Sequence, residues 1–401
     1  MPDENKDLDI STKLVHAGER RPMPDAQPVA TPLFASATFT YDSMEDIDKV
    51  FSGEKQGYIY TRYGNPTVAA LEDALKVAEG GATACAYASG MAAIHAALLA
   101  CDLKPGSTVV ASQDLYGATT NLLTTVFGSF GIKTASVDFE NIKALRDEIQ
   151  KTKPAVLLTE TLSNPLLKVC DIESCAELAH AGGARLIVDN TFASPYLCRP
   201  LMFGADMVVH SATKYLSGHA DAMGGVVVSR DEFDSAALVG VMKLVGGVLG
   251  VWDAHQILRG MKTLGVRLDR QCDNARTLAQ HLLANDRVSK VVYPGLFEGH
   301  LAETAKRMLR DPHAGALVSI ELKDNTTEGA FRFMNALRLC VRSTSLGDVF
   351  TSVLHPTTAF LRDVPPARRK ELGVADGLVR ISVGIEKIED VIDDIEQALD
   401  A

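Results

Sequence analysis

The middle of the chain alternates short apolar segments with helical patterns, and this alternation constrains the fold most. Segments such as TVVAS (108–112), RLIVD (185–189) and DMVVH (206–210) are almost wholly apolar, as strands buried on both faces are. Further predicted strands are TACAYA (83–88), KTASV (133–137), AVLLTE (155–160) and GGVVVS (224–229). Helical patterns between them are GMAAIHAALLAC (90–101), ATTNLLTTVFGSF (118–130), NIKALRDEIQK (141–151) and IESCAELAHAGG (172–183). The alternation predicts an α/β fold whose mostly parallel sheet has helices on both faces.

The flanking parts of the chain have a different character. Residues 1–65 contain Pro22, Pro24, Pro28 and Pro32 and show little periodicity, which predicts an extended arm with one short helix at 44–51. We expect this arm to contact a neighbouring subunit. Residues 66–260 form the predicted sheet domain. A long amphipathic helical region (253–285) leads into a smaller α+β domain, residues 261–401, that ends in LVRISVGIEKIEDVIDDIEQAL.

Charge and cysteine usage exclude several classes of protein. The net charge of -11 disfavours nucleic acid and anionic membranes as partners, because both attract basic surfaces. No apolar run is long enough to span a bilayer, and the opening MPDENKDLDI lacks the features of a secretory signal. The cysteines are scattered without a C-x-x-C pair, and the histidines lack metal-ligand spacing. We therefore expect a cytoplasmic protein with reduced thiols and no metal.

The stretch VVHSATKYLSGHADAMGG (208–225) places one lysine, Lys214, directly after a buried strand. Most lysines are solvated surface charges, and a structural ion pair is a further ordinary reading. However, Asp189 ends the strand RLIVD, and ligands of open α/β sheets bind at the carboxyl ends of strands. A lysine and an aspartate facing one pocket indicate pyridoxal phosphate, which binds covalently to a lysine amine while an aspartate keeps the pyridine nitrogen protonated.

A second stretch fits the phosphate of that cofactor. YASGMAAIHAALL (87–99) runs from a strand through Ser89 and Gly90 into a helix, so the N–H groups of Gly90 and Met91 point to an anion at the helix N-terminus. Such turns are common in α/β proteins and carry little weight alone. The hydroxyls of Ser211 and Thr213 beside Lys214 strengthen the prediction of a phosphate site.

Several motifs together resemble one enzyme family. They are YIYTRYGNPT (58–67), YASGMAAI (87–94), DLYGAT (114–119), TETLSNP (159–165), the stretch 188–225 and LVRISVGIE (378–386). From about residue 11 to the C-terminus, the chain resembles the pyridoxal phosphate enzymes of cysteine and methionine metabolism, which include cystathionine synthases and lyases, methionine γ-lyase and O-acylhomoserine sulfhydrylases. The resemblance implies the aspartate aminotransferase-like fold, fold type I, and a homotetramer built from dimers that share active sites.

The resemblance also implies roles for individual residues. Lys214 would bind the cofactor and carry protons, Asp189 would pair with the pyridinium nitrogen, and Tyr116 would stack on the ring with its hydroxyl near the leaving group. The remaining cofactor ligands would be Gly90, Met91, Asn164, Thr191, Ser211 and Thr213, with Tyr60 and Arg62 supplied by the neighbouring subunit. The substrate would contact Asn164, Ser345 and Arg380.

Arg380 can also be interpreted from its own sequence context. It lies in the apolar strand LVRIS, where an unpaired charge is costly, so it requires a partner. A substrate α-carboxylate can bind it through two parallel hydrogen bonds, and an interdomain ion pair is the structural alternative.

The motifs leave the reaction open between two outcomes that use the same residues. Elimination of a γ substituent from methionine, homocysteine or a related amino acid gives a 2-oxo acid and ammonia, whereas attack by a thiol gives γ-replacement, as in cystathionine γ-synthase or O-acylhomoserine sulfhydrylase. Thr344 replaces the glutamate common in relatives that bind cystathionine, and SLGD with RFMNAL favours a methionine γ-lyase-like enzyme. Ala118, Phe360 and Leu361 depart from the pattern of methionine γ-lyases. A non-enzymatic alternative is a regulator or binding protein that retains the cofactor without turnover.

Overall fold

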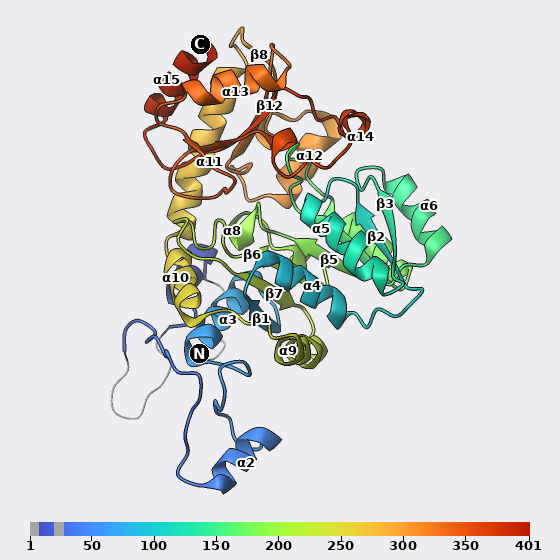
Figure 1. The fold of residues 1–401 in the computed structure, drawn as a ribbon, viewed down its shortest axis with the longest axis vertical. Coiled ribbons are helices and arrows are strands. Elements are labelled where there is room, and N and C mark those ends of the chain that lie inside the picture. Colours follow the sequence, from blue (N-terminus) through green and yellow to red (C-terminus); the bar gives the residue numbers. More distant parts are fainter. Residues whose placement is uncertain (1–7, 20–27) are drawn as a thin grey trace.

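The computed structural model describes residues 8–19 and 28–401, and its centre is a mixed sheet of seven strands (Figure 1). The strand order is β1-β7-β6-β5-β4-β2-β3. The strands are β1 (Thr83–Tyr87), β2 (Thr108–Ser112), β3 (Lys133–Val137), β4 (Val156–Glu160), β5 (Arg185–Asp189), β6 (Met207–Ser211) and β7 (Gly225–Ser229). β7 alone runs in the opposite direction, antiparallel to its neighbours β1 and β6, and the remaining strand pairs are parallel. The predicted mostly parallel sheet and its strands are confirmed.

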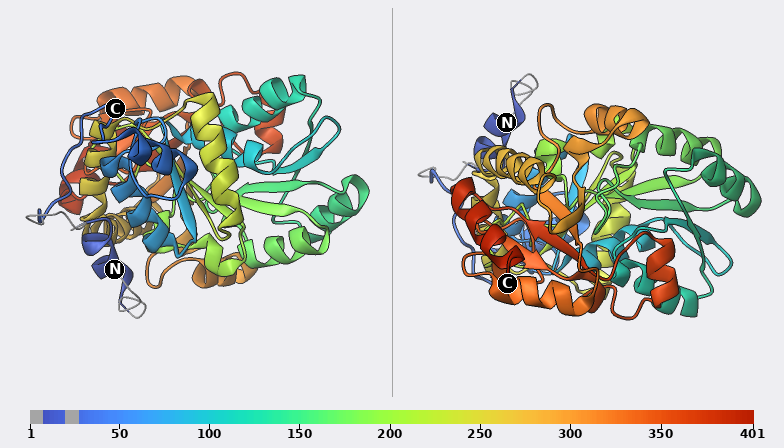
Figure 2. Two further views of the ribbon diagram at one scale, coloured as in Figure 1. Left: turned by 90° about the horizontal axis from the view of Figure 1, so that it is seen from below. Right: turned by 90° about the horizontal axis from the view of Figure 1, so that it is seen from above.

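Helices cover both faces of this sheet, as the views along the long axis in Figure 2 show. Successive residues of β5 alternate between two hydrophobic cores: Leu186 and Val188 lie in one, and Ile187 lies in the other. The helices of this part are α3 (Pro66–Glu79), α4 (Gly90–Ala100), α5 (Gly117–Asn121), α6 (Ile142–Thr152), α7 (Ile172–Ala181), α8 (Ser194–Leu197), η3 (Pro200–Phe203) and α9 (Phe233–Val245). The two-sided burial explains why the strands contain so few polar residues.

Two predicted helical regions differ in detail from the structure. Region 118–130 contains α5 followed by a π-helical segment, η2 (Leu122–Phe127). Region 253–285 forms two helices, α10 (Val251–Met261) and α11 (Leu264–Leu282). The carbonyl of Gly260 there accepts hydrogen bonds from the Thr263 hydroxyl at 3.1 Å and the Arg267 guanidinium at 2.9 Å. Side-chain bonds of this kind replace the regular helical ladder, and hydrophobic periodicity does not reveal them.

The C-terminal part is built on a second sheet of five strands in the order β10-β11-β12-β9-β8. They are β8 (Val288–Val292), β9 (Leu317–Leu322), β10 (Val341–Arg342), β11 (Ser352–Leu354) and β12 (Leu378–Ser382). Accompanying helices are η4 (Pro294–Leu296), α12 (Gly299–Met308), α13 (Thr327–Ala336), η5 (Pro356–Thr358), α14 (Pro366–Glu371) and α15 (Ile388–Leu399). This sheet has its own core with α11, α13 and α15. The domain boundaries at residues 65 and 260 stay a prediction.

The N-terminal part contains α1 (Ile10–His16) and an extended stretch that carries α2 (Met44–Ser52) away from the body of the molecule (Figure 1). The short helix predicted at 44–51 is confirmed. Ser43 caps it by accepting a hydrogen bond from the Asp46 N–H, and Gly53 ends it at a φ of 82°. None of its residues is buried in this chain, while the predicted arm prolines Pro22 and Pro24 lie outside the described residues.

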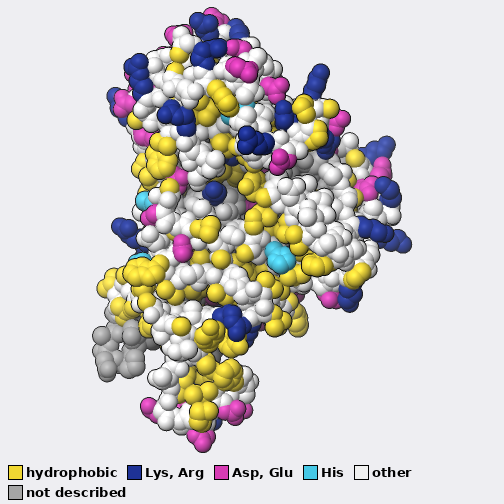
Figure 3. All heavy atoms as spheres, viewed as in Figure 1, with side chains coloured by type: hydrophobic (Ala, Val, Ile, Leu, Met, Phe, Trp, Pro, Cys, Tyr) yellow, Lys and Arg dark blue, Asp and Glu magenta, His cyan; other side chains and the backbone are white. Residues whose placement is uncertain are grey.

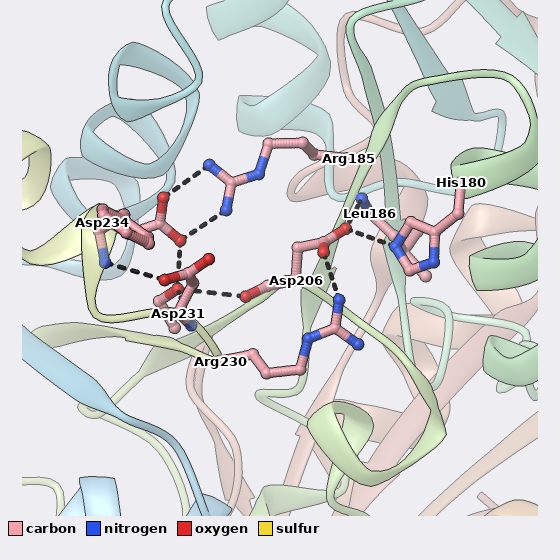
Figure 4. Close-up of polar contacts among 9 residues, drawn as sticks. His180, Arg185, Leu186, Asp206, Arg230, Asp231 and Asp234 are labelled. Atoms are coloured by element: carbon pink, nitrogen blue, oxygen red, sulfur yellow. Dashed lines mark hydrogen bonds and ion pairs between the residues drawn. The ribbon is translucent and has the colours of Figure 1, made fainter.

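Charged side chains tie together the amino ends of β5 and β6, as Figure 4 shows. Arg185, the first residue of β5, forms two hydrogen bonds of 2.7 and 2.5 Å with the carboxylate of Asp234 in α9. Asp206, just before β6, bonds Arg230 at 2.7 Å and His180 at 3.0 Å. These contacts lie at the edge of the sheet opposite to Asp189 and Ser211, so they stabilise the sheet without occupying its ligand-binding edge.

Within the described part of the chain, no helix has both the length and the apolar character required to cross a membrane. In the same residues no group of three or more His, Cys, Asp and Glu side chains is arranged to hold a metal ion. All seven cysteines are free thiols, and all but Cys101 are buried.

Candidate active site

A cavity of about 460 Å³ lies at the carboxyl ends of β4, β5 and β6, where the C-terminal part covers the sheet. It brings together most of the predicted site residues: Gly90, Met91, Tyr116, Asn164, Asp189, Thr191, Ser211, Thr213, Lys214 and Arg380. Thr344, Leu346, Leu354 and Phe360 form the wall from the C-terminal part. The site therefore combines residues from both sheets at the edge where open α/β folds bind ligands.

Lys214 is presented to this cavity by the turn that follows β6. Its backbone N–H donates to the Ser211 carbonyl at 3.2 Å, and its Nζ donates to the Ser345 hydroxyl at 3.3 Å. Burial and then the Arg380 charge lower the pKa of the amine, while Asp348 opposes them. An amine with a lowered pKa is more often unprotonated near neutral pH and is therefore the better nucleophile and base.

Asp189 ends β5 and is oriented by its neighbour Thr191. Both the N–H of Thr191, at 2.9 Å, and its hydroxyl donate to the same carboxylate oxygen, Oδ1. Burial raises the pKa of Asp189 above its ordinary value, although the two bonds from Thr191 lower it. A cationic ring nitrogen placed against this carboxylate would favour the ionised form, and the ionised carboxylate would keep that nitrogen protonated.

The turn between β1 and α4 forms an anion-binding end of the cavity. Ser89 caps α4 by accepting a hydrogen bond from the Ala92 N–H at 3.1 Å. The N–H groups of Gly90 and Met91 make no hydrogen bond within residues 8–19 and 28–401. A Cβ at Gly90 would lie 2.8 Å from the Ser211 Cβ, so only glycine allows this close approach. Unpaired N–H groups at a helix N-terminus beside hydroxyls are the donors that a phosphate requires.

Arg380 lies on β12 with 3% of its surface exposed, and burial lowers its pKa to about 10. Its guanidinium donates to the Asn164 side-chain oxygen at 2.9 Å and to the Ser345 carbonyl at 3.2 Å. The rings of Phe192 and Phe360 lie 6.0 and 5.7 Å from its central carbon. It forms no ion pair with a carboxylate of the described residues, so the interdomain ion pair considered as its alternative is absent there.

Tyr116 is more than one-third exposed, and its ring centroid lies 6.1 Å from that of Phe360. Its N–H donates to Glu160 Oε1 at 2.7 Å. Glu160 was not predicted from the sequence, although it ends β4 and pairs in register with Asp189 on β5. Burial and the Asp189 charge raise the pKa of Glu160 well above its ordinary value. The strand-end rule that indicated Asp189 would also have indicated Glu160.

Most of the other side chains that line the cavity are apolar, and the sequence did not predict them as site residues. The residues are Ile94, Leu162, Phe192, Met223, Leu346, Leu354 and Ala359, and Phe360 joins them. Nothing in their local sequence distinguishes them from ordinary core residues, because the cavity forms only when distant segments meet. Leu361, the neighbour of Phe360, lies in a small buried cluster with Val374 and Leu378 and does not line the cavity.

Tyr60 and Arg62 do not line the cavity that contains Lys214 in their own chain. They border a separate surface depression with Val248 and Val251. The central carbon of Arg62 lies 5.4 Å from the Tyr60 ring centroid and 4.8 Å from that of Tyr63, and Nη1 donates to the Lys243 carbonyl.

Pyridoxal phosphate fits the groups that line this cavity: an amine for the carbonyl carbon, a carboxylate for the ring nitrogen and a helix N-terminus for the phosphate. An open, mostly parallel sheet with these groups at its carboxyl edge is characteristic of fold type I enzymes that depend on this cofactor. The chain belongs to the family described as Cys/Met metabolism PLP-dependent enzymes, whose model matches residues 11–400. The predicted family, fold class and cofactor are confirmed.

Individual relatives cover nearly the whole chain. The L-methionine γ-lyase of Fusobacterium nucleatum subsp. nucleatum is 41% identical over 399 residues, which are 99% of each chain. A cystathionine β-lyase of Coxiella burnetii is 38% identical over 98% of this chain and 99% of its own. The crystal structure of cystathionine γ-synthase from Xanthomonas oryzae pv. oryzae, in complex with aminoacrylate and cysteine, matches with a TM-score of 0.91 at 35% identity over 98% of both chains.

Proposed function

We propose that the protein is a γ-lyase that removes the γ substituent of methionine, homocysteine or a related amino acid and releases a 2-oxo acid and ammonia. The observation that carries this proposal is the buried guanidinium of Arg380, which faces the same cavity as Lys214 without a carboxylate partner in the described residues. An amino-acid carboxylate supplies the missing charge through two parallel hydrogen bonds. The full-length similarity to an L-methionine γ-lyase supports the reaction type.

In this proposal the cofactor is held by groups that the sequence predicted. Lys214 would bind its carbonyl carbon, Asp189 would pair with its ring nitrogen, and Tyr116 would stack on its ring. Its phosphate would be bound by Gly90, Met91, Ser211 and Thr213, with Thr191 supporting Asp189 and Asn164 contacting the 3-oxygen, and all of these residues line the cavity. Bound pyridoxal phosphate supplies an electron-withdrawing ring that stabilises negative charge on the substrate's α and β carbons.

The protein's own groups position the substrate and move protons. Arg380 and Asn164 bind the α-carboxylate, and the Ser345 backbone carbonyl keeps the guanidinium in place. Once the substrate's amine has displaced Lys214 from the cofactor, the freed Lys214 amine takes the α proton, for which its lowered pKa suits it. Tyr116 lines the cavity, and its hydroxyl donates a proton to the sulfur that leaves the γ carbon. Water then completes the release of ammonia and the 2-oxo acid.

The cavity wall favours a γ substituent without a charge. Its carboxylates among the described residues, Glu160 and Asp189, both belong to the sheet edge, where Tyr116 and Thr191 engage them. Apart from Arg380, the wall from the C-terminal part presents Thr344 and apolar side chains instead. A neutral thioether can be buried there at no cost, whereas the distal ammonium of cystathionine would lose its hydration without gaining a partner.

We also propose that the active site is completed by Tyr60 and Arg62 of a partner subunit, within a homotetramer built from dimers. Support comes from the position of these residues outside their own chain's cavity, on an arm whose helix α2 buries nothing in this chain. Figure 3 shows hydrophobic side chains gathered over α2 and the lower body, while charged side chains gather over the C-terminal part. Met44 and Phe51 of α2 are 72% and 62% exposed.

We propose a cytoplasmic location for the protein, and the free thiols support it.

A γ-replacement reaction is the second candidate, because the chain also resembles a cystathionine γ-synthase over its whole length. Product analysis separates the two reactions. The purified enzyme is incubated with methionine, homocysteine, cystathionine and O-acylhomoserines, with and without cysteine or sulfide. We expect a 2-oxo acid and ammonia from a neutral γ-substituted amino acid alone. Consumption of O-acylhomoserine only when a thiol is present would establish replacement, and a colourless, inactive protein would refute both enzyme proposals.

A further inference from the structure

The segment 345–349 lies directly against the turn that carries Lys214. Ser345 accepts a hydrogen bond from the Lys214 amine at 3.3 Å, and the Val349 N–H donates to the Gly218 carbonyl at 3.0 Å. Between them, Gly347 has a φ of 81°, and a Cβ there would lie 2.8 Å from the Tyr215 nitrogen. The segment is therefore fixed, at both ends and in the middle, on the turn that carries Lys214, which we call the lysine turn.

Asp348 in this segment is 1% exposed, and neither of its carboxylate oxygens makes a hydrogen bond of ordinary geometry within the described residues. Its backbone carbonyl accepts from the Gln271 side chain at 2.8 Å, so the main chain holds the residue in place. The Ser345 hydroxyl and the Ala220 N–H still stabilise its charge, but a buried carboxylate without hydrogen bonds of ordinary geometry is costly and rare in a folded protein. Its retention beside the lysine turn calls for a function.

Arg267 of α11 contacts the same turn. It is 3% exposed, and Nη2 donates to the carbonyls of Tyr215 at 2.8 Å and Gly260 at 2.9 Å. Its Nη1 has no hydrogen-bond partner within the described residues. A Cβ on Gly218 would lie 2.2 Å from this atom, so Arg267 rests on the lysine turn itself. Two buried side chains of opposite charge thus contact or face one turn.

The charges that act on Lys214 come from several elements. Arg380 of β12 lowers the pKa of the amine and Asp348 raises it, while Asp189 of β5, Glu160 of β4 and Tyr116 face the same cavity. On Asp348, burial raises the pKa of the carboxyl, and the Ser345 hydroxyl, Lys214, the Ala220 N–H and Arg267 lower it. Asp348 and Tyr215 in turn raise the pKa of Arg267, against the larger opposite effect of its burial.

We propose that Asp348 is a positioning residue whose carboxylate acts as the counter-charge of the Lys214 ammonium, and that Arg267 keeps this carboxylate in its ionised form. In the proposed reaction Lys214 takes a proton from the substrate and becomes a cation in a buried site that already contains Arg380. A fixed negative charge behind the lysine reduces the cost of that state without entering the cavity. The proposal rests on the role proposed for Lys214, but it concerns the amine and not the identity of the substrate.

The test measures the amine directly in the full-length protein after removal of cofactor. The rate at which cyanate carbamylates Lys214 is followed by peptide mass spectrometry over a pH series, which yields the pKa of that amine. We expect Asp348→Asn to lower the pKa by about one unit, which makes the amine roughly tenfold more reactive below its pKa. Asp286→Asn, which removes an exposed carboxylate, should leave the curve unchanged, and circular dichroism verifies folding.

A second variant acts through the charge of Asp348 and tests the proposal if Asp348→Asn does not fold. Arg267→Met removes a cation that lowers the pKa of Asp348, so the carboxyl is protonated more readily and the pKa of the Lys214 amine should fall in the same direction as in Asp348→Asn, by a smaller amount. In the loaded enzyme, the pH midpoint of the cofactor's visible absorbance should also fall in both variants. An unchanged pKa of the amine in folded Asp348→Asn, or a rise in either folded variant, would overturn the proposal. Failure of the γ-lyase reaction itself would appear in product analysis and leave this measurement intact.

Discussion

Arg380 and Asn164 are 216 residues apart in the chain, yet the guanidinium of one donates to the side-chain oxygen of the other at 2.9 Å. Arg380 belongs to β12 of the smaller sheet, and Asn164 follows β4 of the larger one. Their bond therefore couples the two parts of the molecule at the floor of the cavity. It also holds the guanidinium in one orientation, which a planar carboxylate requires if it is to accept two hydrogen bonds together.

Arg380→Lys should weaken substrate use although the positive charge is retained. A lysine ammonium cannot reproduce the paired geometry and cannot also reach Asn164 and the Ser345 carbonyl. We expect kcat/KM to fall by roughly 30-fold, which corresponds to about 2 kcal/mol, mainly through a higher KM. Steady-state kinetics provide the measurement, and Arg287→Lys on the surface serves as the control. If the Arg380→Lys enzyme keeps the wild-type KM, Arg380 does not bind the substrate.

Lys214→Ala should abolish turnover and the visible absorbance that depends on the covalent bond between lysine and cofactor. Alanine provides neither an amine nor a base, and no other lysine lines the cavity in the described residues. Absorbance spectra and product assays provide the readouts, with the exposed Lys133→Ala as a matched control. Substantial remaining turnover would refute the assignment of Lys214 as the base.

Arg62→Ala should weaken cofactor retention through the partner subunit alone. Neither Arg62 nor Tyr60 lines the cavity of its own chain, and we propose that both bind the phosphate in the partner's site. Mixed oligomers of Arg62→Ala and Lys214→Ala subunits should regain some activity, because some sites then contain both intact residues. As a control, Lys214→Ala mixed with Asp189→Ala should regain none, since both residues face one cavity. Absence of recovery in verified mixed oligomers of the first kind would contradict a shared site.

The sequence predicted those parts of the site that depend on local structure. Asp189 and Lys214 were found because strand ends can be recognised from apolar runs, and Gly90 was found because a strand-to-helix turn has a recognisable pattern. Arg380 was correctly placed in a strand, but its contact with Asn164 depends on how two sheets meet. Met223, Leu354 and Asp348 have no local pattern that separates them from core or turn residues. Their surroundings arise from segments brought together only by folding.

Glu160→Gln should stabilise the cofactor-free protein as the pH rises. Burial and the Asp189 charge raise the pKa of Glu160 in the folded protein. The contribution of this carboxyl group to the free energy of unfolding is therefore greatest below its pKa in the unfolded chain, and it is lost as the pH rises through its pKa in the folded protein. Glutamine removes this loss and can still accept the Tyr116 N–H. Thermal unfolding over a pH series should show a higher Tm than wild type at neutral pH and a smaller gain in acid. Asp147→Asn on the surface of α6 should show no such pattern.

Thr344→Glu should shift the substrate preference toward cystathionine. Thr344 lines the cavity on the wall that carries no carboxylate, so a glutamate there would give the distal ammonium of cystathionine a partner. For wild type we expect cystathionine to be a poorer substrate than a neutral thioether, by a few kcal/mol at most, because its ammonium is left unpaired. The ratio of kcat/KM for the two substrates is the measurement, and Thr344→Gln, which has the same shape without the charge, is the control. If Thr344→Glu and Thr344→Gln change the ratio equally, or if wild type already prefers cystathionine, the charge at this position does not determine the choice of substrate.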